Sequence, residues 1–360
     1  MRKFNFLLMV LVFILILLGL PRFSKFPENI SKARQLIKNI SFEPELETYT
    51  TDMKAYLRTY FLVKRGQPYY AALAESVVGD ATRDNLPEEI WGWKLPFIFY
   101  FWSLLPGPPG ASVYFGYLVL LCLTLVASYK LASRLIGRWA ILSVYLLLPY
   151  FFLPLTEITL FQVEWWALSF FILGLAFLIY QKKLSAMVFF LFCIFTRELF
   201  LVHLTMLTLV YLLFRRYRDL WIFVIPVIVL IIFYIFYHLP NVYQFESFEP
   251  VVSWWRSNIH RGWYLIRPTL SYSSWNYFFY FLHPFRIFLL FAIIGLAYKL
   301  SLAKNKLIPS LSLFSFLPFF VFIFFFGIQT KWQDYWGVYY IPLSLIFAPA
   351  VLLFTKNVNE

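Results

Sequence analysis

The chain has 360 residues, of which 61% are hydrophobic and 23% aromatic, and its mean hydropathy is +0.72. This composition excludes an ordinary soluble globular domain and indicates a chain that buries much of its apolar surface in lipid. The formal net charge of +13 does not indicate nucleic-acid binding, because the basic residues lie mostly in short clusters beside apolar runs, as membrane topology requires.

The first apolar run extends from Phe4 to Leu20, directly after Arg2 and Lys3. No small-residue cleavage site follows it, so we interpret residues 1–20 as a first membrane span with a cytoplasmic N-terminus. Residues 21–93 then form a long polar segment in which acidic and basic side chains balance. Apolar residues at helical spacing between Ile30 and Ile40, with lysines and an arginine between them, predict a helix on the membrane surface.

The most informative part of this segment is Thr48 to Tyr70, which reads TYTTDMKAYLRTYFLVKRGQPYY. Thr50 or Thr51 can cap a helix that begins at Asp52, and Gly66 followed by Gln67-Pro68 ends it. Asp52, Tyr56 and Tyr60 are four residues apart, so they share one face of that helix. We expect this carboxylate and these phenols to face a catalytic cavity.

The remainder of the chain is dominated by apolar runs. A short aromatic helix is expected over 94–105, ending at the sequence PGPPG, and is too short to cross a bilayer. We therefore predict an all-α fold: a single domain, 1–360, forming a polytopic membrane bundle of about ten spans with a helical first extracytoplasmic loop. The domain comprises the first span (1–20), the outer loop (21–93), spans within 94–239, a second outer loop (240–283), and spans within 284–360. Together with the first span, the candidates are 111–130, 139–155, 161–180, 184–197, 199–214, 219–238, 284–300, 307–327 and 337–354.

The distribution of basic clusters predicts the orientation of these spans. The clusters fall on alternate connections, which the positive-inside rule assigns to the cytoplasm. Both termini are then cytoplasmic, and 21–93 and 240–283 lie on the outer face of a plasma or inner membrane. The clusters are Lys130, Arg134 and Arg138; Lys182 and Lys183; Arg215, Arg216 and Arg218; and Lys299, Lys304 and Lys306.

The outer face also receives ionisable residues at membrane depth, where a charged side chain is costly and commonly functional. Each of these residues also has a purely structural interpretation. Asp52 is also a favourable helix-dipole carboxylate, and Arg197 with Glu198 is also an ion pair that holds two helices together. The loop arginines suit a phosphate but are also interfacial anchors. The candidates are Asp52, Glu157, Glu164, Arg197 and Glu198, with Arg256, His260, Arg261 and Arg267 in the second loop.

The topology and the segment TDMKAYLRTYFLVKRGQPYY resemble the GT-C superfamily of integral-membrane glycosyltransferases, in particular its polyprenyl-phosphate-mannose-dependent members. KLPFIFYF and the Thr196–Glu198 sequence TRE are also similar to that group. The resemblance implies a polyprenyl-phosphate-linked sugar as donor, a glycan, lipid or protein acceptor, and inversion at the anomeric carbon. Asp52 corresponds to the acidic residue of the family's first loop. Tyr56, Tyr69 and the outer-face residues Glu164, Arg197, Glu198, Arg256, His260, Arg261 and Arg267 are then candidates for binding substrate.

A single carboxylate suffices for this chemistry. A lipid phosphate leaves as a stable anion without a general acid, so one base for the acceptor hydroxyl and cations for the phosphate are enough. We expect Asp52 to be the base, and Arg197 with the loop arginines Arg256, Arg261 and Arg267 to bind the donor phosphate. Some related families pair two acidic residues in this loop, whereas here only Glu45 and Glu47 lie upstream of Asp52. We therefore expect no metal and no other cofactor, since a divalent cation lacks the paired acidic motif.

Two other classes of protein remain open from the sequence. An O-antigen-type polymerase or ligase has a late loop rich in Arg and His, as 240–283 is, but lacks an acidic first loop. A lipid-linked sugar flippase or transporter also places charges in an outer cavity, but should carry them near the midplane of several spans.

Overall fold

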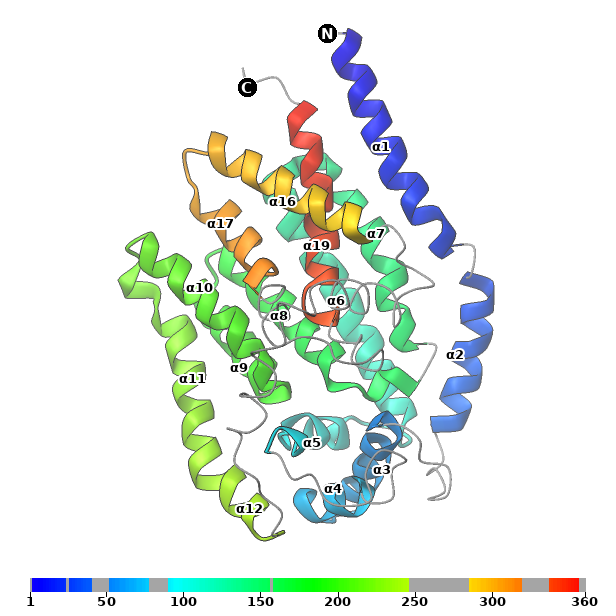
Figure 1. The fold of residues 1–360 in the computed structure, drawn as a ribbon. Coiled ribbons are helices and arrows are strands. Elements are labelled where there is room, and N and C mark those ends of the chain that lie inside the picture. Colours follow the sequence, from blue (N-terminus) through cyan, green and yellow to red (C-terminus); the bar gives the residue numbers. More distant parts are fainter. Residues whose placement is uncertain are drawn as a thin grey trace, which may run out of the picture.

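A computed structural model describes residues 2–23, 26–40, 52–77, 90–155, 158–245, 285–318 and 337–355. Within these ranges every regular element is helical and no strand occurs, which confirms the predicted all-helical class (Figure 1). Of the expected site residues, Glu157, Arg256, His260, Arg261 and Arg267 lie outside the described residues. Asp52 is described by its backbone only.

The helices follow the predicted apolar runs closely. Those of the bundle are α1 (Arg2–Phe23), α6 (Ala111–Ile136), α7 (Ile141–Phe151), α8 (Val163–Ile179), α9 (Lys183–Thr196), α10 (Leu201–Leu213), α11 (Trp221–Phe233), α16 (Phe285–Leu302), α17 (Leu307–Phe314) and α19 (Ile341–Phe347). The others are α2 (Phe26–Ile40), α3 (Asp52–Lys64), α4 (Tyr69–Val77), α5 (Phe97–Leu104) and α12 (Leu239–Tyr243). Short helical turns join several of them: η2 (Ile90–Gly92), η3 (Gly137–Ala140), η4 (Leu153–Leu155), η5 (Ile158–Phe161), η6 (Glu198–Phe200), η7 (Tyr217–Asp219), η8 (Tyr234–His238) and η10 (Ala348–Thr355).

Within the described ranges, three helical stretches are long and apolar enough to cross a membrane: Ala111–Phe151, Trp221–Tyr243 and Gly337–Phe354. The first comprises α6 and α7, which pack against each other on either side of Gly137. Gly137 has a φ of +59°, which is strained for residues with a side chain and suits a helix-ending glycine. Five further apolar helices are shorter, such as α8 and α9.

Helix α8 is the centre of the bundle. Of its 17 residues only Phe177 is not buried, and it packs against α9 on one side and α6 on another. A helix that is apolar all round must be enclosed by other helices or by lipid. Gly174 lets α9 approach closely, because a Cβ at this position would lie 2.7 Å from the Phe190 ring.

The peripheral helices expose apolar side chains. On α11 and η8 these include Ile228, Ile232 and Phe236, and on α6 they include Phe115 and Val119. Apolar surface of this extent is unfavourable in water and favourable against lipid. The buried centre and apolar periphery therefore agree with a membrane-embedded chain.

The two ends of the bundle differ. The start of α1 and the end of η10 lie at one end, and α3, α4 and α5 lie at the other (Figure 1). Two contacts join connections that carry basic clusters: the Arg134 guanidinium lies 4.4 Å from the Tyr180 ring centroid, and Lys183 Nζ lies 2.6 Å from Asp219 Oδ1. These contacts bring the α6–α7, α8–α9 and α10–α11 connections next to one another.

Helices α3 and α4 form a hairpin. Helix α3 begins at Asp52 as predicted, and Gly66, with a φ of +94°, follows its end. The backbone N–H of Gly66 donates to Val63 O and that of Gln67 donates to Leu62 O, which satisfies carbonyls at the helix end. The threonines expected to cap α3 lie outside the described residues.

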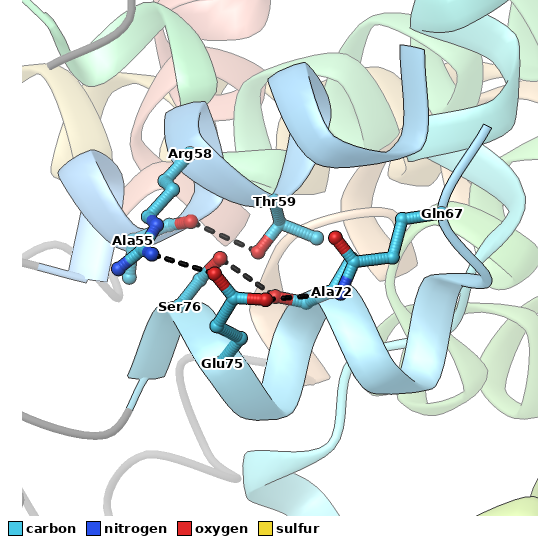
Figure 2. A network of polar contacts seen from close by, with 7 residues as sticks. All are labelled: Ala55, Arg58, Thr59, Gln67, Ala72, Glu75 and Ser76. Carbon is cyan, nitrogen blue, oxygen red and sulfur yellow. Dashed lines mark hydrogen bonds and ion pairs between the residues drawn. The ribbon is translucent and has the colours of Figure 1, made fainter. Parts of the chain in front are cut away.

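The two helices of the hairpin are joined by a polar network centred on Glu75 (Figure 2). Arg58 Nη2 lies 2.7 Å from Glu75 Oε1, and Gln67 Nε2 donates to Glu75 Oε2 at 3.0 Å. Glu75 is about half exposed, so this ion pair contributes little to stability.

Candidate functional site

The predicted face of α3 packs into the bundle. Tyr56 meets Phe99 of α5 edge-on at 5.9 Å, and Tyr60 is fully buried with its ring 6.1 Å from that of Phe161. The Tyr60 hydroxyl accepts from the Gly110 N–H at 3.3 Å and lies 3.4 Å from Ser112 Oγ. Tyr60 therefore serves in packing, at the junction of α5 and α6.

Lys64, at the C-terminal end of α3, also contacts α5. Lys64 Nζ donates to Ser103 O at 2.6 Å and to Leu105 O at 3.2 Å, at the C-terminal end of α5. A cation is favourable there because the last carbonyls of a helix lack intrahelical partners and carry partial negative charge. Helix α3 is thus held against α5 along its whole length, with Asp52 at its first turn.

Helix α4 places two tyrosines against the bundle. The Tyr69 hydroxyl donates to Lys94 O at 2.6 Å, and the Tyr70 hydroxyl lies 2.8 Å from His238 Nδ1. Burial raises the pKa of Tyr69 and of Tyr70 well above the ordinary value, with neighbouring tyrosines adding to the effect. Both phenols therefore remain neutral at physiological pH.

Three of the predicted charged residues, Glu164, Arg197 and Glu198, form one cluster with Tyr339, which we call the Arg197 cluster. Arg197 Nε lies 2.9 Å from Glu164 Oε1 and donates to the Tyr339 hydroxyl at 3.0 Å. Arg197 Nη1 donates to Glu198 Oε1 at 2.7 Å. The side chains of Glu164, Arg197 and Glu198 are only 3–5% exposed.

The chain positions these groups where helices begin or end. Glu164 lies in the first turn of α8. The Arg197 backbone is extended (φ −153°, ψ 108°), so the chain is not helical between α9 and η6. At this break, the consecutive residues Arg197 and Glu198 bring opposite charges together. With both carboxylates ionised, Glu164, Arg197 and Glu198 carry a net charge of −1. A buried excess charge is costly unless a further partner compensates it.

Helix α5 lies between the hairpin and the Arg197 cluster. It packs against α3, and its residue Phe97 lies 6.3 Å, centroid to centroid, from Phe195 near the end of α9. Tyr56 of α3 and Tyr69 of α4 both contact the Phe99 ring of α5, at 5.9 Å and 5.1 Å between centroids. Of the expected residues, the structure therefore brings together two groups: Tyr56 with Tyr69, and Glu164 with Arg197 and Glu198.

The sequence analysis did not single out His238 and Tyr339, which also belong to this region. His238 carried a usable signal, because an ionisable side chain inside an apolar span is uncommon. It also ends the π-helical turn η8, a geometry that is frequent at functional sites. Tyr339 carried no such signal among so many aromatic residues.

Among the described residues, no group of three or more His, Cys, Asp or Glu side chains is arranged to hold a metal ion.

Comparison with known proteins finds no matching family model, no matching curated protein and no matching solved structure.

Proposed function

We propose that this protein is a membrane glycosyltransferase. It transfers a sugar from a polyprenyl-phosphate donor to an acceptor hydroxyl on the extracytoplasmic face, with inversion and with Asp52 as the base. In this proposal the bundle has about ten spans and both termini are cytoplasmic. The acceptor is a glycan, a lipid or a protein.

The observation that supports the proposal most is the position of the α3–α4 hairpin. It packs at the end of the bundle opposite the start of α1 and the end of η10 (Figure 1), and its residues Tyr69 and Tyr70 are buried. Asp52 opens α3, one helical turn before Tyr56. An acidic residue at the start of a helix at this end of the bundle suits a reaction in which a lipid-linked donor and an aqueous acceptor meet at the membrane surface.

The chemistry requires few groups. The donor phosphate departs as a stable anion, so no general acid is needed, and Asp52 accepts the proton of the attacking hydroxyl. Cationic side chains then stabilise the charge on the phosphate. Guanidinium groups suit this role because their N–H donors match phosphate oxygens.

The geometry favours the structural alternative for Arg197. Its guanidinium already contacts Glu164 and Glu198, and a phosphate would meet both carboxylates there. We therefore assign the donor phosphate to Arg256, Arg261 and Arg267. Arg197 instead holds the ends of α8, α9 and α10 together.

The test is to incubate purified protein in detergent with a panel of polyprenyl-phosphate sugars and candidate acceptors, and to measure release of the polyprenyl phosphate. Release that depends on Asp52 supports the proposal. Turnover of the lipid-linked substrate by an Asp52→Asn variant would favour an O-antigen-type polymerase or ligase. Movement of lipid-linked sugar across vesicles without any release would favour a flippase or transporter.

A further inference from the structure

The Arg197 cluster holds two carboxyl groups against a single guanidinium. The Arg197 atoms Nε and Nη1 are bonded to the same carbon, and they lie 2.9 Å from Glu164 Oε1 and 2.7 Å from Glu198 Oε1, respectively. Among the described residues, neither glutamate forms an ion pair with any other cation. With both carboxyl groups ionised, the cluster therefore carries one uncompensated negative charge.

This excess charge would be buried. The side chains of Glu164, Arg197 and Glu198 are 3–5% exposed, and Glu198 Oε2 has no hydrogen-bond partner within the described part of the chain. Leaving a buried acceptor unpaired is costly, and the cost is higher when the group is charged. Two carboxyl groups that share one buried site resist ionising together, so one of them retains a proton.

Among the described residues, the helices that pack against η6 supply no second cation to the cluster. These helices are α9 and α10. The lysine of α9, Lys183, lies at the opposite end of that helix and pairs with Asp219. The other titratable side chains of the two helices are Cys193, His203 and Tyr211, and a thiol and a phenol are ordinarily neutral at physiological pH.

Two fully buried histidines contact neutral groups. The His203 ring packs against those of Phe171 and Phe200, at 4.9 Å and 5.0 Å between centroids. His238 Nδ1 lies 2.8 Å from the Tyr70 hydroxyl, and Tyr70 is a phenol. Burial in such surroundings favours the neutral imidazole. Neither histidine therefore offsets the charge of the cluster.

We propose that the Arg197 cluster is a proton-binding site, in which Glu164 and Glu198 together hold one proton at neutral pH. The proton resides on Glu198 Oε2, since that oxygen has no hydrogen-bond partner among the described residues. A proton needs only a lone pair and no cavity. It cancels the excess charge and leaves Glu164 ionised against Arg197. The site does not depend on the proposed transferase activity.

The bound proton links folding to pH. An exposed glutamate has an ordinary pKa of about 4.3, so both carboxyl groups are ionised in the unfolded chain at neutral pH. Folding then takes up one proton. Because the folded chain binds more protons than the unfolded chain, stability decreases as the pH rises through the neutral range.

The test is infrared spectroscopy of the full-length protein in detergent at neutral pH, with and without isotope-labelled glutamate. The carbonyl stretch of a protonated carboxyl group is separate from the bands of ionised carboxylates, and the label identifies it as glutamate. The unmodified protein should show this band. Glu198→Gln should abolish it, because Glu164 and Arg197 then balance each other. Glu164→Gln should abolish it as well, because Glu198 then ionises against Arg197.

Glu75→Gln is the matched control, because it makes the same chemical change at a half-exposed glutamate and should leave the band intact. Thermal unfolding identifies a variant that fails to fold, and the other variant then decides. Absence of the band from the unmodified protein would overturn the proposal without any variant. A band that persists undiminished in a folded Glu164 or Glu198 variant would also overturn it, because the proton would then belong to another glutamate.

Discussion

The Tyr70 hydroxyl lies 2.8 Å from His238 Nδ1, and the two residues are 168 positions apart in the chain. This contact joins the α3–α4 hairpin to η8, the helical turn that follows α11. The hairpin that begins at Asp52 is therefore held to a segment that lies far from it in the chain.

Replacing Tyr70 by Phe should loosen the hairpin. The change keeps the ring but leaves His238 Nδ1 without its partner, which costs about 1–3 kcal/mol. Hydrogen exchange should accelerate at the amides of α4 and remain unchanged in the buried α8. Tyr217→Phe, at an exposed tyrosine on the opposite face, is the control and should change neither. Unaltered exchange in α4 would mean that apolar packing alone holds the hairpin.

Replacing Arg197 by Met should destabilise the bundle strongly. It leaves Glu164 and Glu198 buried without their cation, a change that costs about 3–5 kcal/mol. The midpoint of thermal unfolding in detergent should fall far more than for Lys183→Met, whose half-exposed ion pair with Asp219 is expected to contribute under about 1 kcal/mol. A variant with an unchanged midpoint but weakened donor binding would instead return Arg197 to the phosphate site.

Replacing Asp52 by Asn should slow transfer about 10²–10⁴-fold, because the amide keeps the shape of the carboxylate but cannot accept the proton. The thermal unfolding midpoint should change little. Glu75→Gln, in the same hairpin, is the control and should retain activity. Near-normal turnover in folded Asp52→Asn would move the base to Glu47 or Glu164 and remove the main support for the glycosyltransferase assignment.

The predicted orientation can be tested by cysteine labelling in intact cells. Ser76, although in the outer loop, is buried, whereas the adjacent Glu75 and Arg218 on the opposite face are exposed. In a Cys122→Ser background, Glu75→Cys should react with an impermeant maleimide from outside, and Arg218→Cys should react only after permeabilisation. The reverse pattern would place the hairpin in the cytoplasm and exclude an extracytoplasmic active site.

Local sequence determined most of the secondary structure. Apolar run length predicted the helices of the bundle, and Asp52 and Gly66 marked the ends of α3 because helix termini depend on the few residues around them. The basic residues beside apolar runs predict an orientation in the membrane, because charge near a span responds to the membrane rather than to distant parts of the chain, and this orientation stays a prediction.

Only the tertiary structure decided what those residues contact. Arg197 pairs with Glu164, far from it in the chain, and with Tyr339, 142 positions away, and no local pattern encodes either contact. Nor does spacing show that Tyr60 packs against Phe161 while the Tyr69 hydroxyl donates to Lys94 O. Helix periodicity fixes which face a side chain is on, whereas packing between distant segments fixes its partners. For that reason the sequence alone indicated charged residues at membrane depth, and the fold alone showed that two carboxylates share one guanidinium.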